Sequence, residues 1–264
     1  MFEKVNPMHP DKLADRIAGA MTDLAYKHQE NPKVATEILL GHGYAHIIAE
    51  SSYNFKEKEV EAILKRIVPD KVILDLKVYP QDKHLAENQE KGIRCGDNGI
   101  FKGVPVSHEE RALTEIAKII YKHFPTDGKY ILDAANKKTI ICQSHADEKE
   151  LQLLYPYATT NPLGRWEGGI NVDTGATNRK LGSDMGQSVT GGGLHGKDAT
   201  KGDVSLNIYA FNKAQATGKE VTISCAIGDT IVDGKPYSEI VKEALEYINK
   251  LGGFEKFAEW GLIR

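Results

Sequence analysis

Residues 173–203 read DTGATNRKLGSDMGQSVTGGGLHGKDATKGD, and this stretch is the most distinctive part of the chain. It combines closely spaced glycines with several cations and carboxylates. Glycines let backbone amides approach a phosphate, cations neutralise its oxygens, and carboxylates hold Mg²⁺. A solvated, Gly-rich loop explains any one of these pieces alone, but their density favours a polyphosphate site. The charged members are Arg179, Lys180, Lys197, Asp198, Lys201 and Asp203.

A P-loop is the first alternative for this stretch, because residues 191–197 satisfy the first seven positions of G-x-x-x-x-G-K-[ST]. The eighth position fails, since Asp198 replaces the hydroxyl residue that holds Mg²⁺. Residues 185–190, just before the motif, also lack the pattern of a buried strand that opens a parallel sheet. The sequence therefore disfavours a P-loop.

Periodic segments on both sides of the glycine-rich stretch predict an α+β fold with mostly antiparallel sheets. Residues 81–103 are polar and contain glycine, so a loop is expected there. We predict three domains, at residues 1–95, 96–165 and 166–264. Helices are predicted over 11–27, 56–67, 107–123, 206–216 and 238–251, and strands over 33–40, 44–50, 70–79, 130–132, 139–142 and 220–227.

Composition excludes several classes of protein. The 264 residues are 41% hydrophobic and 27% charged, as in globular proteins. A net charge of −3 gives no basic field for nucleic acid or anionic membranes, so neither is an expected partner. The three cysteines have no disulfide or zinc spacing, and no apolar run approaches the roughly 20 residues of a membrane span. We expect a soluble, cytoplasmic protein.

Two shorter motifs are weak alone. His9-Pro10-Asp11-Lys12 opens the first predicted helix, where the helix N-terminus, a cation and a carboxylate can receive a phosphate and its metal. A capping aspartate beside a solvated lysine explains the same residues. The segment 95–99, CGDNG, reads in isolation as a turn.

Taken in order, these motifs resemble the methionine adenosyltransferase (S-adenosylmethionine synthetase) family. The family motif G-H-P-D-K is kept at residues 8–12 except for its glycine. K-V-A-x-E-T resembles residues 33–37, and G-D-Q-G resembles 96–99. In the second half, N-P-x-G-R-F resembles 161–166 and D-x-G-L-T-G-R-K resembles 173–180. The pattern G-G-G-x-x-x-G-K-D-x-x-K-x-D resembles 191–203 nearly position by position, with one fewer residue before Gly196. An Ala-Ile-Gly follows a strand at 226–228.

The resemblance implies a shortened member of that family, with pseudo-repeated domains of mostly antiparallel sheet and helices on one face. It implies that the sulfur of L-methionine attacks the ribose C5′ of ATP and that triphosphate leaves and is hydrolysed to pyrophosphate and phosphate. No general base is needed, so the protein's contribution is orientation and stabilisation of the leaving group's charge. It also implies Mg²⁺ and K⁺ as cofactors and a homodimer with shared sites.

The resemblance assigns roles to individual residues. The residues assigned to triphosphate binding and catalysis are His9, Lys12, Arg179, Lys180, Lys197 and Lys201. Mg²⁺ is assigned to Asp11 and Asp203, and K⁺ to Glu37. Methionine is assigned to Glu50, Asp97 and Gln81, and the nucleotide to Trp166, Asp173, Ile227 and Lys137.

One motif aligns ambiguously. The family carries P-D-x-K-[ST]-Q-V-T, whose lysine binds phosphate, and residues 132–139 are the corresponding region. Either Lys137 supplies the cation, or Asp133 aligns and Ala135 occupies the lysine position. We favour Lys137.

Two other functions remain open from the sequence. A polyphosphate or nucleotide hydrolase would keep the anion site while losing methionine, but Glu50 and Asp97 argue against it. A degenerate homologue would hold nucleotide without catalysis, but the retained cations and carboxylates argue against that.

Overall fold

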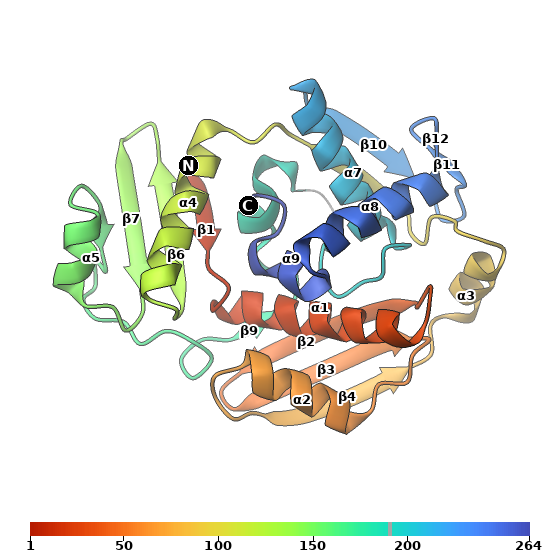
Figure 1. The fold of residues 1–264 in the computed structure, drawn as a ribbon, viewed down its shortest axis with the longest axis horizontal. Coiled ribbons are helices and arrows are strands. Elements are labelled where there is room, and N and C mark those ends of the chain that lie inside the picture. Colours follow the sequence, from red (N-terminus) through yellow and green to blue (C-terminus); the bar gives the residue numbers. More distant parts are fainter. Residues whose placement is uncertain (190–191) are drawn as a thin grey trace.

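The computed structural model describes residues 1–189 and 192–264 (Figure 1). Its first sheet has the order β4-β3-β2-β9. The hairpin of β2 (Val34–Gly41) and β3 (Tyr44–Ser51) is antiparallel, while β4 (Ile73–Tyr79) runs parallel to β3. The short β9 (Gly175–Ala176), from the glycine-rich stretch, completes the other edge of the sheet.

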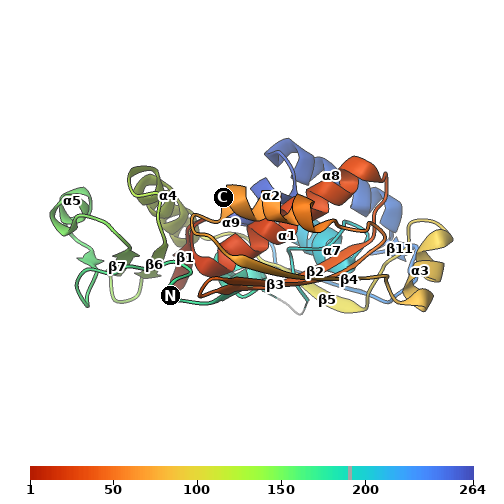
Figure 2. The same ribbon diagram turned by 90° about the horizontal axis from the view of Figure 1, so that it is seen from below.

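Helices α1 (Pro10–His28) and α2 (Glu57–Ile67) cover one face of this sheet. Leu13, Ile17 and Met21 of α1 recur at helical spacing, are buried, and pack in one core with Leu40 and Ile47. The opposite face of the sheet is not covered by any described helix or strand (Figure 2). This uncovered face is apolar in part, and its exposed hydrophobic residues are Leu39, Tyr44, Ile48, Ile73 and Tyr79.

A second sheet has the order β1-β6-β7-β8 and lies at the left of Figure 1. Its strands are β1 (Phe2–Val5), β6 (Gly128–Asp133), β7 (Lys138–Gln143) and β8 (Thr159–Thr160). Helix α4 (His108–His123) packs against it through Leu113, Ala117 and Ile120, and α5 (Glu148–Leu154) lies at its outer end. The first strand of the chain therefore pairs with residues more than a hundred positions later.

The third unit is at the right of Figure 1, where β5 (Gly99–Gly103) pairs with β10 (Val221–Cys225). Helices α7 (Gly202–Thr217) and α8 (Tyr237–Leu251) form its core together with α9 (Phe254–Trp260). A small hairpin of β11 (Ile231–Val232) and β12 (Lys235–Pro236) lies beside them. Helix α9 also packs closely on α1, where a Cβ on Gly19 would lie 2.7 Å from the carbonyl oxygen of Phe254.

The predicted α+β fold with mostly antiparallel sheets is confirmed. Six of the strand pairings in the described residues are antiparallel and two are parallel. The segment expected to be a loop contains α3 (Lys83–Glu90) as well as β5. The glycine-rich stretch contains a short helix, α6 (Leu181–Met185), and a 3₁₀ turn at Gly186–Ser188. Among the described residues, no helix has the length and apolarity needed to cross a membrane.

Candidate active site

The N-terminus of α1 carries a histidine with a free, buried nitrogen. His9 is the N-cap residue, and its Nδ1 accepts a hydrogen bond from the backbone N–H of Asp11 at 3.1 Å. Because Nδ1 accepts, the neutral ring carries its proton on Nε2, and that buried atom has no partner among the described residues. Burial, with Lys129 and Lys180 nearby, lowers the pKa of His9 to about 3. The neutral His9 ring can therefore donate a hydrogen bond from Nε2 to an acceptor on a ligand.

Asp11 joins this helix to the glycine-rich stretch. Its Oδ1 accepts from the backbone N–H of Ala176 at 2.8 Å, and its Oδ2 lies 2.8 Å from the ammonium of Lys180. The guanidinium of Arg179 is 3.5 Å from Oδ1. A Cβ on Gly175 would lie 2.1 Å from the carbonyl of Pro10, so only glycine permits this approach. The structure thus brings His9, Asp11, Arg179 and Lys180 together.

The second half of the stretch lies against β2. Lys197 forms an isolated antiparallel bridge with Ala35. Its ammonium lies 3.0 Å from Asp203 and 3.8 Å from Glu37, whose other oxygen accepts a hydrogen bond from the Thr177 hydroxyl. The candidate Mg²⁺ and K⁺ ligands Asp203 and Glu37 therefore share one lysine.

The P-loop alternative is not supported by this geometry. In the described part of the motif, residues 192–203, Lys197 pairs with a strand, and α7 begins only at Gly202. A P-loop lysine instead belongs to the first turn of the following helix. Gly191, the first glycine of the motif, lies outside the described residues.

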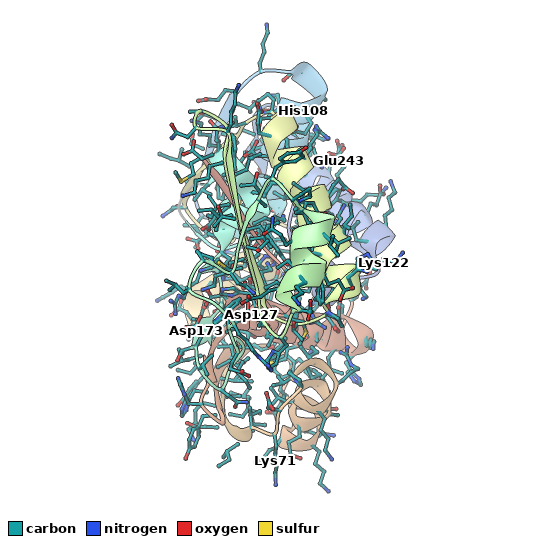
Figure 3. The ribbon with its side chains drawn as sticks, turned by 90° about the vertical axis from the view of Figure 1, so that its left-hand side faces the viewer. Lys71, His108, Lys122, Asp127, Asp173 and Glu243 are labelled. Carbon is teal, nitrogen blue, oxygen red and sulfur yellow. The ribbon has the colours of Figure 1, made fainter. Side chains whose placement is uncertain are left out.

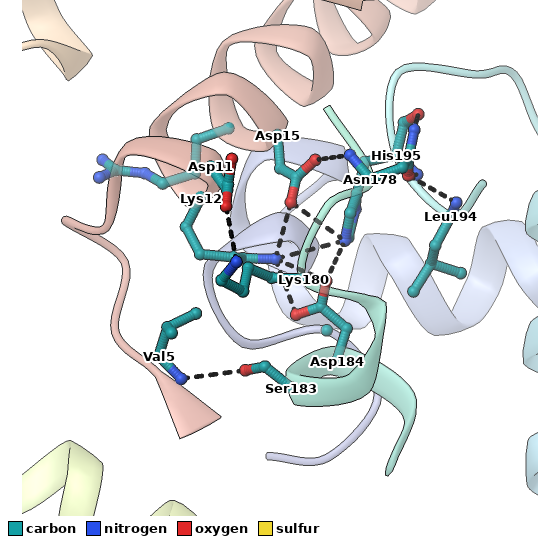
Figure 4. A network of polar contacts seen from close by, with 12 residues as sticks. Val5, Asp11, Lys12, Asp15, Asn178, Lys180, Ser183, Asp184, Leu194 and His195 are labelled. Atoms are coloured by element: carbon teal, nitrogen blue, oxygen red, sulfur yellow. Dashed lines mark hydrogen bonds and ion pairs between the residues drawn. The ribbon is translucent and has the colours of Figure 1, made fainter. Parts of the chain in front are cut away.

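A buried ionic network holds the two halves together (Figure 4). Lys12 donates to both carboxylate oxygens of Asp184 at 2.7 Å and to Asp15 at 3.1 Å, and His195 Nε2 lies 2.9 Å from Asp184. Asn178 accepts from the backbone N–H groups of residues 194 and 195 at 2.8 and 2.9 Å. The start of α1 and the segment that carries Lys197 are therefore adjacent.

The network also sets the protonation of its members. Burial alone would lower the pKa of Lys12, but Asp184 and Asp15 outweigh it and raise that pKa. Burial alone would raise the pKa of Asp184, but Lys12 and His195 outweigh this effect and lower that pKa. Asp15, Asp184 and His195 are close enough to share a metal ion. The Lys12 ammonium already satisfies these carboxylates, and since it is fully buried, this enclosure favours a structural role over the predicted catalytic contact.

Sequence reasoning missed a cation in this cluster. Lys129, at the start of β6, lies 3.6 Å from Asp173, and after burial its positive charge makes the largest contribution to the lowered pKa of His9. Lys137 lies in the β6–β7 turn, beyond the far end of β6. Along β6, Lys129 is separated from the far end of the strand by about 13 Å, at roughly 3.3 Å per residue. Residues 125–129, PTDGK, contain the Asp-x-Lys order of the family motif with one extra residue, and this signal was available in the sequence.

Asp127, two residues before Lys129, belongs to the same cluster. It lies close to Asp173 in Figure 3, and the charge of Asp173 acts on it. One carboxylate oxygen accepts from the backbone N–H of Gly169 at 2.8 Å, and the other is buried without a partner among the described residues. Burial raises the pKa of Asp127 to about 6.

The candidate nucleotide residues lie at opposite ends of the molecule. Trp166 lines a hollow of 310 Å³ beside the β6–β7 hairpin, together with Lys129, Cys142 and residues 161–165. Ile227 follows β10 at the other end and donates its backbone N–H to Asn98 at 2.6 Å (Figure 1). The two side chains of one chain are therefore not placed to contact one adenine ring.

The candidate methionine residues lie toward the Ile227 end. Glu50 is exposed on the uncovered face of the first sheet, directly opposite Ala35. Gln81 follows β4, and both polar atoms of its amide are buried without partners among the described residues. Asp97 precedes β5, next to Gly96, whose backbone N–H donates to the carbonyl of Thr200 at 3.2 Å. That contact places the Asp97 loop beside Lys201.

Known proteins resemble this chain in sequence and in fold. No protein-family model matches the sequence. An S-adenosylmethionine synthase of Mesoplasma florum is 28% identical over 92% of this chain and 85% of its own. One of Mycoplasma capricolum is 28% identical over 86% of this chain and 76% of its own. A solved structure, an unusual S-adenosylmethionine synthetase from Campylobacter jejuni, superposes with a TM-score of 0.73 over 99% of this chain and 94% of its own, at 20% identity.

The fold is therefore that of the S-adenosylmethionine synthetases, an α+β architecture of mostly antiparallel sheets with helices on one face. The sequence relatives also show how this chain compares in length. The alignment with the Mesoplasma florum relative runs over 322 positions against 264 residues here, so the relative carries additional segments. In sequence and in fold the chain is similar to the S-adenosylmethionine synthases, and it is shortened relative to them.

Proposed function

We propose that the chain makes S-adenosylmethionine from ATP and L-methionine. The observation that carries this proposal is the buried, protonated Nε2 of His9, which has no partner among the described residues and lies near Lys129 and Lys180. A neutral donor surrounded by cations suits an oxyanion. Arg179 extends the positive surface of the same cluster.

These positive charges suit triphosphate as the leaving group of the reaction. The sulfur of methionine forms a bond to the ribose C5′ while the C5′–O5′ bond breaks, and triphosphate departs with the electron pair. Since a thioether has no proton to lose, no base is required. His9, Lys129 and Lys180 stabilise the negative charge that grows on the departing oxygen, a contribution of the kind that is worth roughly 10²–10³ in rate for each donor. Hydrolysis of triphosphate to pyrophosphate and phosphate uses the same cations.

The carboxylates at the site fit metal ions. Asp11 and Asp203 offer oxygen ligands of the type that Mg²⁺ prefers, and each is paired with a lysine that a polyphosphate can also engage. Bound there, Mg²⁺ would neutralise part of the triphosphate charge. Glu37, between Thr177 and Lys197, is the proposed K⁺ ligand.

We propose that methionine is held by Glu50, Gln81 and Asp97. Carboxylates suit its ammonium group, and the amide of Gln81 suits its carboxylate. Both polar atoms of Gln81 are buried without a partner among the described residues, which supports this role.

A homodimer completes the site in this proposal. Trp166 and Asp97 belong to opposite ends of one chain, so a substrate that contacts both must lie between two chains (Figure 1). The uncovered face of the first sheet is the proposed interface, because Leu39, Ile48 and Ile73 expose 48%, 53% and 59% of their surface there. Contiguous apolar surface of this kind marks protein contacts.

One assay tests the function. The protein is incubated with ATP, methionine, Mg²⁺ and K⁺, and the sulfonium product, phosphate and pyrophosphate are quantified by mass spectrometry and ion chromatography. We expect one sulfonium per pyrophosphate. Phosphate release without sulfonium would identify a hydrolase, and nucleotide binding without either product would identify a non-catalytic homologue. An Asp11→Asn variant should need a higher Mg²⁺ concentration to reach half of its maximal rate.

A further inference from the structure

Two of the three cysteines lie side by side at the Asp97 end of the site. Cys95 precedes β5 and Cys225 ends β10, and their sulfur atoms are 3.0 Å apart. Both sulfurs are within hydrogen-bonding distance of the Asp97 carbonyl oxygen, at 3.2 and 3.3 Å. Cys142 lies in β7 of the second sheet, at the other end of the chain's fold.

Backbone hydrogen bonds fix the pair in place. Cys95 donates its N–H to Asp229 at 2.9 Å and accepts from the N–H of Gly228 at 2.8 Å. Cys225 is held by the sheet, opposite Gly99. The two sulfurs are therefore in close approach because both main-chain segments are fixed, and the approach does not depend on a mobile terminus.

The two thiols differ in access and acidity. Cys95 is fully buried, while Cys225 is partly exposed. The thiol of Cys225 hydrogen-bonds to the sulfur of Cys95 and lowers the pKa of Cys95, although burial opposes this, and the same contact raises the pKa of Cys225. Cys95 is thus the better thiolate and Cys225 the more accessible sulfur.

We propose that Cys95 and Cys225 are a redox modification site, which a small-molecule disulfide converts to a reversible protein disulfide that repositions the Asp97 loop. The effect on the loop rests on the proposed function, because Asp97 is assigned there to methionine.

The reaction balances as two exchanges. The accessible Cys225 sulfur attacks one sulfur of the small disulfide while the adjacent Cys95 thiolate takes its proton, so a mixed disulfide forms at Cys225 and one small thiol leaves. The Cys95 thiolate then attacks the Cys225 sulfur and expels the second small thiol. The two protein thiols lose two protons and two electrons, and the small disulfide is reduced to two thiols.

Closing the bond must move the loop. The sulfurs have to approach from 3.0 Å to about 2.05 Å, the length of a disulfide. The Asp97 carbonyl oxygen, which lies within hydrogen-bonding distance of both sulfurs, at the same time loses any thiol donor. The next residue, Asn98, accepts from the backbone N–H of Ile227, so the displacement reaches both loops of this end of the site.

Disulfide formation is tested without reference to activity. The full chain is incubated with glutathione disulfide, alkylated and digested, and cross-linked peptides are mapped by mass spectrometry. We expect a Cys95–Cys225 peptide in the wild type and in the Cys142→Ser control, with a mass loss equal to two hydrogens, and none in Cys225→Ser. Formation of mixed disulfides alone, or of none, would overturn the assignment.

The kinetic effect is tested on the same samples. We expect the oxidised wild type to show a KM for methionine raised by roughly threefold to tenfold, as expected when one polar contact is weakened. Dithiothreitol should restore it, and Cys225→Ser should be insensitive to the oxidant. A disulfide that leaves the KM unchanged would overturn control of the Asp97 loop. If the disulfide forms and the reduced protein makes no sulfonium, the proposed function fails while the redox site stands.

Discussion

Lys12 donates its ammonium to both carboxylate oxygens of Asp184 at 2.7 Å, although 172 positions separate the two residues. Both side chains are fully buried, and His195 and Asp15 complete the network. The contact ties the start of α1 to the stretch that carries Arg179, Lys180 and Lys197 (Figure 4). The cluster of candidate phosphate-binding groups depends on this tie.

Asp184→Asn should destabilise the protein by about 3 kcal/mol, because it leaves the buried Lys12 ammonium without its main counter-ion. Urea unfolding measures the change. The matched control is Glu115→Gln, which breaks an exposed pair with Lys118 and should leave the unfolding midpoint within error. Equal effects of the two variants would contradict the structural role of the network.

Lys129→Ala should lower kcat about 10²-fold to 10³-fold, since it removes a cation beside His9 and Asp173. Lys137→Ala, in the β6–β7 turn, should leave kcat unchanged. Steady-state kinetics with both substrates compare the two. The reverse ranking would restore the alignment that places Lys137 at the site.

The neutral state of His9 makes stability dependent on pH. Its pKa is about 3 in the folded protein against an ordinary value of 6.5, so between these values the unfolded state binds the extra proton. Stability is therefore retained above pH 6.5 and declines toward pH 3, by up to about 1.4 kcal/mol per pH unit from this one group. A His9→Gln variant should show a shallower decline in urea titrations over that window. Parallel slopes would contradict a buried neutral ring.

Ile48→Asp should convert the proposed dimer to a monomer and abolish synthesis, because it places a charge on the uncovered face of the first sheet. Analytical ultracentrifugation reads the mass, and the product assay reads activity. Leu153→Asp on α5, at a residue that is 82% exposed, is the control and should change neither. A fully active Ile48→Asp monomer would exclude the shared site.

The elements with strong periodicity were predictable from the sequence. Leu13, Ile17 and Met21 recur at helical spacing, so α1 was found, and the β2–β3 hairpin followed from its β-forming residues. Helix α3 was missed because Gln89 is its one buried residue, so no apolar stripe marks it. The pairing of β1 with β6 was also missed, since a long-range pairing leaves no local signal.

The candidate site likewise has a part that the sequence could predict and a part that it could not. The cluster of His9, Asp11 and Lys180 followed from motif order, because each motif keeps its spacing. The enclosure of Lys12 was not predictable, since it depends on Asp184 and His195, which reach it only through the tertiary fold. Lys129 was missed for a different reason: one extra residue in the loop before β6 displaced the alignment.

The most direct test of the shared site is complementation between two inactive variants. Lys129→Ala damages the Trp166 end and Asp97→Asn the Ile227 end, so a mixed dimer would contain one site with both lesions and one with neither. The two variants are co-expressed with different tags, and sulfonium formation is measured on the mixture. We predict recovery of about one quarter of wild-type activity, as random pairing of a two-fold dimer gives. Activity that stays at the average of the two separate variants would contradict a site built from two chains.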